Sequence, residues 1–424
     1  MANYAIVGIN WGDEGKGRMV DYLAEKYDVV VRYQGGNNAG HTVINDKGKF
    51  ILNLLPSGIL REDKVNVMGG GMVIDVAHLS REIAKLREAG ISITPDNLKI
   101  SDRAVICFPF NVMQDCLEED RLGDKKFGST RRGIAPIYAD KYMKKAIRMG
   151  DLLEPEYLKD RLATVLDWKN ICLSAYKGAK QYTLEEMTEW LDEFAAQFKP
   201  YVCDIGTYLT AAAKEGKNIM FEAQLGALRD IDFGIYPYTS SSNTISAYAP
   251  IGAGVPNLRI DKTVGIMKAY STCVGEGPFT AEMFGEEAVK LREAGGEYGA
   301  ATGRPRRVGG FDVVASRYGC RVQAADEVAL TKLDILDNMD RIPVVDAYEI
   351  DGELVTEFPF GEKLVKAKPH VVYFEGWKCP TTACRTFDEL PAQARAYVEY
   401  IEKAVGTFVK YVSVGAERDS IIIR

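Results

Sequence analysis

The stretch AIVGINWGDEGKG, residues 5–17, joins a short apolar run to a glycine-rich turn that ends in Gly-Lys-Gly. An apolar strand that leads through such a turn into a helix is typical of a phosphate site, because backbone N–H groups and the positive end of the helix converge on an anion. The usual phosphate loop has a hydroxyl side chain after the lysine, and this hydroxyl binds Mg²⁺. Here Gly17 stands in its place, and Asp13 lies inside the turn. We expect a helix to begin near Gly15, Lys16 to meet a terminal phosphate and Asp13 to supply the metal ligand. The alternative is a plain glycine turn with a solvated charged triplet.

Further Val- and Ile-rich runs alternate with amphipathic stretches along the chain. Such runs suit strands that are buried on both faces, and the stretches between them suit helical crossovers. We therefore predict an α/β fold with a large, mostly parallel central sheet and flanking helices. The predicted strands are YAIVGI (4–9), DVVVRY (28–33), VNVMG (65–69), LKIS (98–101), NIMF (218–221), DKTVGIM (261–267) and EVALTKLD (327–334).

Helix and turn signals refine this prediction. An apolar stripe indicates a helix between Asp75 and Gly90, and a capping box of Thr183 and Glu186 opens another that runs to Phe198. Asp351-Gly352 between alternating runs predicts a hairpin, and hence small antiparallel elements. Since no repeat or Pro/Ser-rich linker interrupts residues 1–424, we expect a single large α/β domain with long functional loop insertions.

Composition narrows the class of protein. The chain has 424 residues, of which 46% are hydrophobic, and a net charge of −7 with acidic and basic residues mixed. This pattern argues against a nucleic-acid partner. The N-terminus has no signal-peptide pattern and no apolar run is long enough to cross a bilayer, so we predict a cytoplasmic protein without membrane contact. The eight cysteines are scattered, and we expect reduced, structural thiols.

Several loops carry residues suited to small anionic ligands. In RYQGGNNAGHT (32–42) the glycines allow close approach of a ligand, and His41 can donate a charged hydrogen bond to a phosphate oxygen. His78 lies near the apolar stripe of its helix and is predicted to be structural, whereas His370 is assigned no role. FGSTRRGIAPIYADK (127–141) suits a monophosphate or is a plain basic loop, and YPYTSSSNT (236–244) is a second row of hydroxyls or a solvated turn.

Two further clusters concern a carboxylate and a base. ATGRPRRVGG (301–310) holds Arg304, Arg306 and Arg307 and predicts a carboxylate or phosphate site, the alternative being a solvated basic loop. In LTKLDILD (330–337), Lys332 and Asp334 end a predicted strand. An aspartate can accept both the N1–H and the 2-amino group of guanine, so a phosphate loop combined with this tetrapeptide indicates GTP.

In sequence order these segments resemble the adenylosuccinate synthetase family, which joins IMP and L-aspartate at the expense of GTP. The resemblance spans Tyr4 to Arg418. The motifs that carry it are WGDEGKG (11–17), GGNNAGHT (35–42), LLPSGIL (54–60), GST-RRGIAPIYADK (128–141), FEAQLGALRDIDFGIYPY (221–238), GEGPFTAE (275–282), TGRPRR (302–307), TKLD (331–334) and SVGAERD (413–419).

The resemblance implies a set of functional residues. Asp13 is the general base, which removes a proton from IMP and binds Mg²⁺ together with the Gly40 carbonyl; Lys16 and His41 are the other catalytic residues. The implied GTP site is Gly12, Glu14, Gly15, Lys16, Gly17, Gly40, Thr42, Lys332, Asp334, Ser413 and Gly415. The implied IMP site is Asn38, Thr130, Lys144, Gln224, Ser240 and Arg304, and the implied aspartate site is Thr302, Arg304 and Arg306. The family further implies a homodimer in which Lys144 reaches the partner's IMP.

Some positions depart from the family pattern and leave alternatives open. FEAQLG puts Leu225 where the family has glutamine, so Gln224 must shift by one residue or the contact changes; Ser240 replaces the usual threonine, and Lys144 the usual arginine. A ligase of the same shape acting on another purine monophosphate such as GMP is therefore one alternative. A regulatory GTPase is another, although it would need neither the loop at 35–42 nor the loop at 302–307.

Overall fold

The computed structural model describes residues 2–45, 48–299, 303 and 305–424. Its central feature is a ten-stranded sheet in which every neighbouring pair is parallel except the last, β19 with β20. Each of the predicted strands lies in this sheet, which confirms the α/β fold class. In spatial order the strands are β20 (Ile421–Ile423), β19 (Phe408–Ser413), β15 (Glu327–Thr331), β11 (Lys262–Lys268), β1 (Asn3–Gly8), β10 (Ile219–Glu222), β2 (Val29–Arg32), β5 (Val65–Met68), β7 (Leu98–Ser101) and β9 (Val202–Cys203).

Strand β1 lies in the middle of the sheet, between β10 and β11. Its residues Ala5, Ile6 and Val7 are fully buried, because helices and loops cover both faces of the sheet, as the continuous apolar run predicts. Since neighbouring strands are parallel, the loops that follow β1, β10, β11, β15 and β2 all leave from the same edge of the sheet. The chemistry-bearing loops of the sequence are therefore gathered at this edge.

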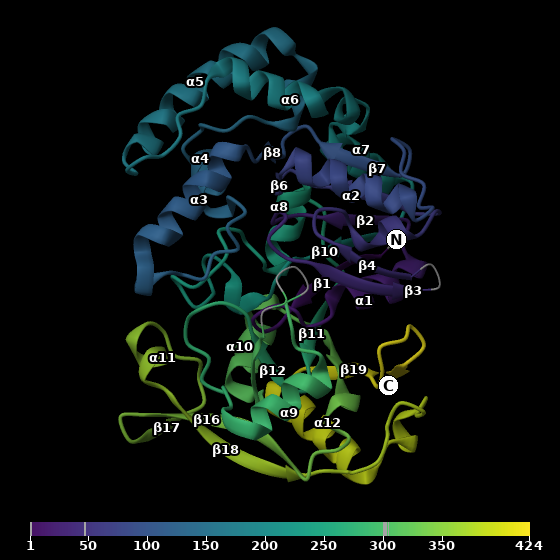
Figure 1. Ribbon diagram of the computed structural model, residues 1–424. Helices are drawn as coiled ribbons and strands as arrows, with labels where there is room; N and C mark the ends of the chain where they lie inside the picture. The colour runs from purple at the N-terminus through teal and green to yellow at the C-terminus, as the bar shows by residue number, and fades with distance from the viewer. Residues whose placement is uncertain (1, 46–47, 300–302, 304) are drawn as a thin grey trace.

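The helices form two groups, at opposite ends of the molecule (Figure 1). One end holds α2 (Val76–Glu88), α3 (Pro109–Leu122), α4 (Ile134–Tyr142), α5 (Pro155–Ser174), α6 (Leu184–Phe198) and α7 (Ile205–Lys214). Toward the other end lie α9 (Gly285–Gly295), α10 (Val313–Gln323), α11 (Glu362–Lys366) and α12 (Ala392–Val405), while α1 (Lys16–Leu23) and α8 (Ala249–Ala253) lie beside the sheet between them.

The two predicted helix starts are confirmed in detail. Asp75 caps α2 by accepting the His78 N–H at 2.8 Å, and Thr183 caps α6 by accepting the Glu186 N–H at 3.1 Å. A side chain that takes one of the unpaired N–H groups of the first turn stabilises a helix by roughly 1 kcal/mol. The ring of His78 lies 3.2 Å from Asn53 Oδ1, which agrees with a structural role.

Small sheets complete the fold. β3 (His41–Asn45) pairs with β4 (Gly48–Leu52), and β12 (Ser271–Cys273) with β13 (Arg307–Gly309), both antiparallel. β16 (Arg341–Ile350) pairs antiparallel with β17 (Glu353–Val355) and β18 (Lys368–Glu375) and parallel with β14 (Phe311–Asp312), and β6 (Val73–Ile74) runs parallel to β8 (Val105–Ile106). Asp351 and Gly352 turn the β16–β17 hairpin with φ values of 53° and 87°, as predicted for a primed turn.

None of the described helices combines the length and the apolar character that crossing a bilayer requires. All eight cysteines lie in the described part of the chain and are free thiols.

Candidate active site

The glycine-rich turn after β1 has the backbone that its sequence predicts. Gly12, Asp13 and Gly15 have φ values of 100°, 60° and 96°, in the left-handed region that glycine enters freely and aspartate tolerates. Gly15 is also the N-cap of α1, so the positive end of that helix lies where the sequence predicts it. The turn and the helix together provide an anion site at the carboxyl end of β1.

The carboxylate of Glu14 lies inside this turn. Its Oε1 accepts the N–H groups of Asn10 at 3.1 Å and Gly12 at 2.7 Å, and its Oε2 accepts Lys16 Nζ at 2.7 Å. Backbone amides and a lysine are the donors that usually surround a phosphate oxygen. The side chain of Glu14 therefore satisfies the donors of the loop from within.

The position after the lysine has no room for a hydroxyl side chain. A Cβ atom added at Gly17 would lie 2.8 Å from His41 Cβ and 3.4 Å from Ser57 Oγ, and the first distance is shorter than van der Waals contact allows. The glycine that sets this loop apart from the usual phosphate loop is thus required by the close approach of His41.

His41 forms a buried pair with Glu222, the last residue of β10. Nδ1 of His41 lies 2.5 Å from Glu222 Oε1, and Glu222 also accepts the N–H of Ser57 at 2.7 Å and its hydroxyl at 2.6 Å. Burial lowers the pKa of His41, and Glu222 acts in the opposite direction. Burial also disfavours the charged form of Glu222, but His41 and Arg32 outweigh it and hold the pKa of its carboxyl below the usual value.

The other ring nitrogen of His41 is available to a ligand. Nε2 is buried and has no hydrogen-bond partner among the described residues. Because Glu222 holds Nδ1, the orientation of the ring is set and Nε2 is the ring nitrogen that can contact a ligand.

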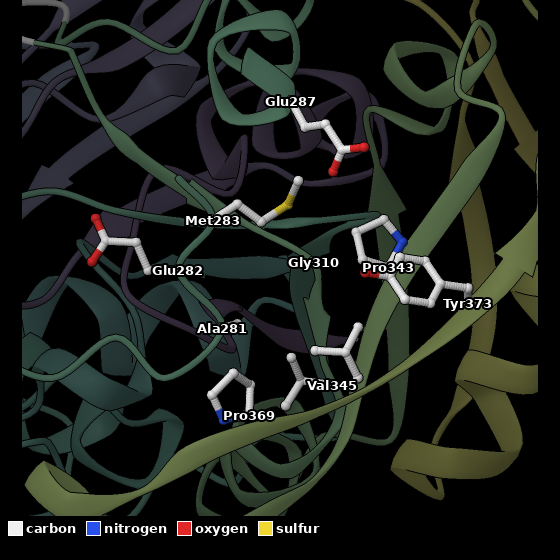
Figure 2. Close-up of a pocket in the computed structure, with 10 residues that line it drawn as sticks. Ala281, Glu282, Met283, Glu287, Gly310, Pro343, Val345, Pro369 and Tyr373 are labelled. Atoms are coloured by element: carbon white, nitrogen blue, oxygen red, sulfur yellow. The ribbon is translucent and has the colours of Figure 1, made fainter. Parts of the chain in front are cut away.

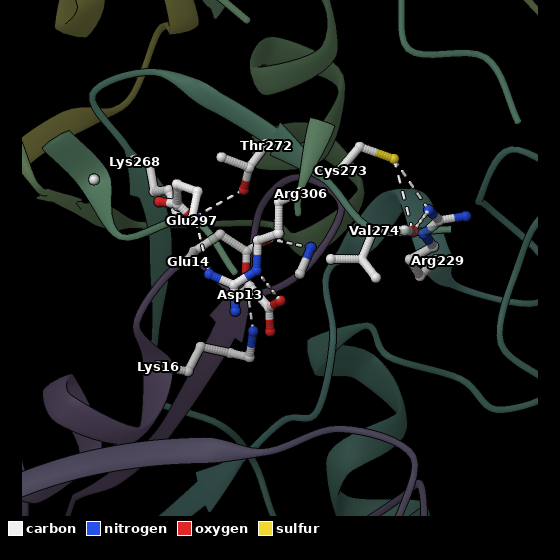
Figure 3. Close-up of polar contacts among 12 residues, drawn as sticks. Asp13, Glu14, Lys16, Arg229, Lys268, Thr272, Cys273, Val274, Glu297 and Arg306 are labelled. Atoms are coloured by element: carbon white, nitrogen blue, oxygen red, sulfur yellow. Dashed lines mark hydrogen bonds and ion pairs between the residues drawn. The ribbon is translucent and has the colours of Figure 1, made fainter. Parts of the chain in front are cut away.

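Asp13 faces an arginine that is itself held by a buried acid. Arg306 Nε forms an ion pair with Asp13 Oδ2 at 3.0 Å, and Arg306 Nη1 donates to Glu297 Oε2 at 2.6 Å. Figure 3 shows Arg306 joined to both carboxylates. The side chain of Asp13 is 28% exposed, so solvent and ligands can reach it.

The residues predicted to bind guanine lie at the carboxyl end of β15 and beside α1. Lys332 adopts a left-handed φ of 60° and precedes the short helix Leu333–Leu336, which contains Asp334. Burial raises the pKa of Asp334, and Arg18 acts against this shift. Arg18 also donates to the hydroxyl of Ser413, so Asp334 and Ser413 both lie near this arginine.

Several predicted IMP contacts lie on loops that pack together. Gly128 lies close to the GEGPFTAE segment, since a Cβ atom added at this glycine would be 2.9 Å from the N atom of Glu276. The same loop carries Thr130, whose side chain is exposed. The N–H of Ser240 donates to Arg229 O at 2.9 Å, and its hydroxyl lies 3.3 Å from that of Ser242. Asn38 Oδ1 accepts the N–H of Gly36 at 3.3 Å. The YPYTSSSNT segment is therefore an ordered part of the structure and not only a solvated turn.

Leu225 stands at the position where the family pattern has glutamine, and Gln224 directly precedes it; the two side chains make different contacts. Gln224 is fully buried, and its amide is used at both ends: Oε1 accepts the Gly36 N–H at 3.1 Å and Nε2 donates to Gly36 O at 3.0 Å. Leu225 has a φ of 62°, and its Cα would lie 3.4 Å from a Cβ atom added at Gly12. The side chain of Leu225, not that of Gln224, therefore lies against the turn that carries Asp13.

Other predicted residues are only partly located. Thr302 and Arg304 lie outside the described residues. Gly40 and Thr42 directly flank His41 at the start of β3, Gly415 accepts the Ser413 hydroxyl at 3.2 Å, and Lys144 is exposed just beyond the end of α4.

Sequence reasoning missed three charged residues of this cluster: Glu222, Glu297 and Arg18. Glu222 stands within a quoted motif, but its partner His41 is 181 positions away along the chain. Glu297 follows an amphipathic helix, where an acid is usually solvated, and Arg18 lies one residue after the phosphate-loop motif. A usable signal existed only for Glu222, as the charged residue that ends a buried strand.

A separate hollow lies near β14, β16 and β18 and is lined by residues such as Glu282, Met283, Pro343 and Tyr373 (Figure 2). Its lining includes no predicted site residue, so we assign the chemistry to the loop cluster at the sheet edge. Among the described residues, no group of three or more His, Cys, Asp or Glu side chains has the arrangement of a metal site.

Comparison with known proteins relates the whole chain to one family. The profile of the family described as adenylosuccinate synthetase matches residues 5–422. Adenylosuccinate synthetase 2 of Pseudoalteromonas translucida is 47% identical over 426 residues and is covered over its full length, as is this chain. The adenylosuccinate synthetase of Caldanaerobacter subterraneus subsp. tengcongensis is 44% identical, with 100% of this chain and 99% of that protein aligned.

Solved structures give the same result. The fully ligated adenylosuccinate synthetase of Plasmodium falciparum has a TM-score of 0.92 and 33% identity, with 99% of each chain covered. A cyanophage S-2L succinoaminodeoxyadenylate synthetase, described as bound to dGMP and dATP, has a TM-score of 0.59 and 18% identity, with 100% of this chain and 95% of that chain covered. At that identity the likeness concerns the fold alone.

Proposed function

The chain belongs to the adenylosuccinate synthetase family of GTP-dependent ligases, and on that premise we propose that Asp13 is its general base, with Lys16 and His41 as the other catalytic residues. The family's reaction joins IMP to L-aspartate and consumes GTP in purine nucleotide biosynthesis. The observation that carries the proposal is the 3.0 Å ion pair of Asp13 with Arg306. It brings the proposed base into direct contact with a group that can bind a carboxylate, beside the phosphate loop.

The first chemical step is a phosphoryl transfer to IMP. Asp13 accepts the proton from N1 of the purine, and the resulting O6 oxyanion attacks the γ-phosphorus of GTP. The O6–phosphorus bond forms, the bond to the bridging oxygen breaks, and GDP leaves. A positioned general base contributes roughly a hundred- to ten-thousand-fold to such a step.

The second step replaces the new phosphate. The amine of L-aspartate attacks C6 of 6-phosphoryl-IMP, and the C6–O6 bond breaks to release phosphate, while the amine loses its proton to give adenylosuccinate. Arg306 binds a carboxylate of the amino acid in this proposal. Its contact with Asp13 supports the assignment, because the guanidinium pairs with a carboxylate at this place.

Lys16 and His41 balance charge on the phosphates. Lys16 Nζ, which pairs with Glu14 at 2.7 Å, meets the γ-phosphate, and His41 Nε2 donates to phosphate oxygens on the side of the leaving GDP. Fixed donors aimed at developing charge usually contribute about 3–4 kcal/mol each to the transition state. The buried pair of His41 with Glu222 supports this role.

The donor set also fits Mg²⁺. This ion is commonly bound by one or two carboxylates together with substrate phosphates and water, and the partly exposed Asp13 carboxylate with the Gly40 carbonyl would complete such a shell. When bound, Mg²⁺ neutralises charge on the β- and γ-phosphates. In this proposal Lys332, Asp334, Ser413 and Gly415 surround the guanine, and Asn38, Thr130 and Ser240 contact IMP.

We further propose a homodimer in which Lys144 contacts the partner's IMP phosphate. Lys144 is exposed, and so are its neighbours Tyr142 (68%) and Met143 (49%), which supports a contact surface at the end of α4. The single-domain organisation, the cytoplasmic location and the lack of a nucleic-acid partner stay predictions.

The identity of the purine is tested by a product assay that crosses IMP and GMP with GTP and ATP in the presence of L-aspartate. We expect product with IMP and GTP; product only with GMP would refute the IMP assignment. Steady GTP hydrolysis that needs neither IMP nor aspartate would favour the regulatory GTPase.

The role of Asp13 is tested with Asp13→Ala. This variant keeps its affinity for GTP within about tenfold and loses turnover, because general-base help is worth up to roughly ten-thousand-fold. Asp63→Asn, which removes an acid that is 69% exposed, is the matched control and keeps full activity. Full activity in Asp13→Ala would end the assignment.

A further inference from the structure

Glu297 is a buried carboxylate that lies between two of the predicted substrate sites. It follows α9, and its side chain is 0% exposed. Its Oε1 accepts Lys268 Nζ at 2.9 Å, Tyr270 Oη at 2.6 Å and Lys332 Nζ at 2.6 Å. Its Oε2 accepts Lys268 Nζ at 3.0 Å and Arg306 Nη1 at 2.6 Å (Figure 3).

This carboxylate holds three cations together. Although burial raises the pKa of Glu297, Lys268, Lys332 and Arg306 outweigh it and hold that pKa below the usual value. Burial lowers the pKa of Lys268 to about 8, and Lys332 and Arg306 act in the same direction. Without the negative charge, three cations would face one another in a poorly solvated place, so the positions of all three depend on Glu297.

The first dependent residue is Lys332, assigned above to guanine. Its ammonium group donates to Glu297 and, at 2.7 Å, to Gly295 O. Because the ammonium group is engaged by protein acceptors, the hydrocarbon stem of the side chain is the part left to lie along a planar base. Glu297 thereby fixes the direction in which the Lys332 side chain extends.

The second dependent residue is Arg306, assigned above to the aspartate carboxylate. Glu297 binds its side chain, and the two residues are also joined through the backbone, since the Arg306 N–H donates to Glu297 O at 2.9 Å. Arg306 in turn contacts Asp13 at 3.0 Å. A continuous chain of charged contacts therefore runs from Lys332 through Glu297 and Arg306 to Asp13.

We propose that Glu297 is a positioning residue that couples the guanine site to the aspartate site. By holding Lys332 and Arg306 on one carboxylate, it makes the binding of the nucleotide and the binding of the amino acid depend on each other. The inference rests on the assignments of Lys332 and Arg306 made under the proposed function. It assigns Glu297 no contact with a substrate.

The test is Glu297→Gln, which keeps the shape of the side chain and removes its charge. The expected result is a rise of about tenfold or more in the KM for GTP and in the KM for L-aspartate, because hydrogen bonds between charged groups are worth about 1.5–3 kcal/mol. The KM for IMP is expected to stay within about threefold. The matched control is Glu282→Gln, because Glu282 binds the next arginine, Arg307 Nε, at 2.9 Å but has no contact with Lys332; it leaves the KM for GTP unchanged.

Coupling itself is measured by calorimetry with IMP present, as the Kd of L-aspartate with and without GDP. Coupling between sites is typically five- to about a hundred-and-fifty-fold and is reciprocal, so in the natural enzyme GDP is expected to lower this Kd by about fivefold or more. In Glu297→Gln the effect should fall below about twofold. Coupling that persists at the natural level, or a KM change for only one of the two substrates, would overturn the proposal.

A second variant guards against misfolding of the first. Tyr270→Phe removes one neutral donor from Glu297 and leaves every charge in place; it is expected to reduce the coupling by about twofold to threefold, and no change would count against the proposal. The proposed function is judged separately, by Lys332→Ala and Arg306→Ala in the natural background. If these variants leave GTP and aspartate binding intact, the site assignments fail whatever Glu297→Gln shows.

Discussion

Replacing Glu222 with glutamine tests whether the buried pair with His41 controls the chemistry. Glu222 Oε1 lies 2.5 Å from His41 Nδ1, and the two side chains are 0% and 7% exposed. When the ring is protonated both of its nitrogens can donate, Nδ1 to Glu222 and Nε2 to a phosphate oxygen. The rate should therefore be full below the pKa of His41 in the substrate complex and fall as the pH rises through it.

The size of the shift follows from the geometry. Opposite charges about 4 Å apart interact by about 4 kcal/mol at an effective dielectric constant of 20, which corresponds to about 3 pKa units and is an upper limit. Glutamine keeps a neutral hydrogen-bonding group, and the difference between a charged and a neutral hydrogen bond alone is worth about 1 unit. Since Glu222 acts to raise the pKa of His41, its loss moves the alkaline limb of the rate profile to lower pH by about 1–3 units.

The assay is the initial rate of adenylosuccinate formation from the acidic to the alkaline range, with Ser57→Ala as control. Ser57 donates to the same carboxylate at 2.6 Å but carries no charge, so its loss should move the limb by less than about half a unit. A Glu222→Gln enzyme that is slower by the same factor at every pH would refute the reasoning. Glu222 would then only support the fold.

Three further outcomes are expected. Burial raises the pKa of Asp312 to about 6, so between about pH 4 and 6 the native state retains a proton that the unfolded state has released. The free energy of unfolding should therefore fall by about 3 kcal/mol over that interval relative to the Asp312→Asn variant, as measured by urea titrations. Lys169→Met should lower the free energy of unfolding by about 3–5 kcal/mol, because it leaves Asp140, now 2.6 Å from Lys169 Nζ, as a buried unpaired charge; a loss below about 1 kcal/mol would contradict this. Gln224→Leu should raise the KM for IMP by about tenfold, because the N–H and C=O of Gly36 each lose a buried partner, and an unchanged KM would show that this loop does not depend on Gln224.

Seven strands of the sheet could be predicted from the sequence because each contains a run rich in apolar residues bounded by a loop. The strands that were missed have other patterns. β9, which consists only of Val202 and Cys203, and β20, Ile421–Ile423, are the two edges of the sheet. β19, Phe408–Ser413, begins with an exposed and a half-buried residue, Phe408 and Lys410, on either side of the buried Val409. Short and edge strands depend on pairing partners that local patterns do not reveal.

The site could be predicted where its residues form contiguous motifs, as for Asp13, Lys16 and His41. The buried acids Glu222 and Glu297 could not be predicted, because the residues that they contact are distant in sequence. Glu297 lies near Lys268, Lys332 and Arg306 only after three separate segments have folded together. The contact of Leu225 with Gly12 could not be predicted either, because it depends on a left-handed backbone at Leu225 that the FEAQLG motif does not indicate.

The close approach of His41 to Gly17 means that the residue type at one of these positions limits the residue type at the other. A serine or threonine at position 17 would bring its Cβ to 2.8 Å from the Cβ of His41, and every residue at position 41 except glycine carries that Cβ atom. A hydroxyl side chain at position 17 therefore requires either that the start of β3 move away or that position 41 lose its side chain. The place that a hydroxyl side chain usually takes after the lysine is therefore closed by a residue from a different segment of the chain.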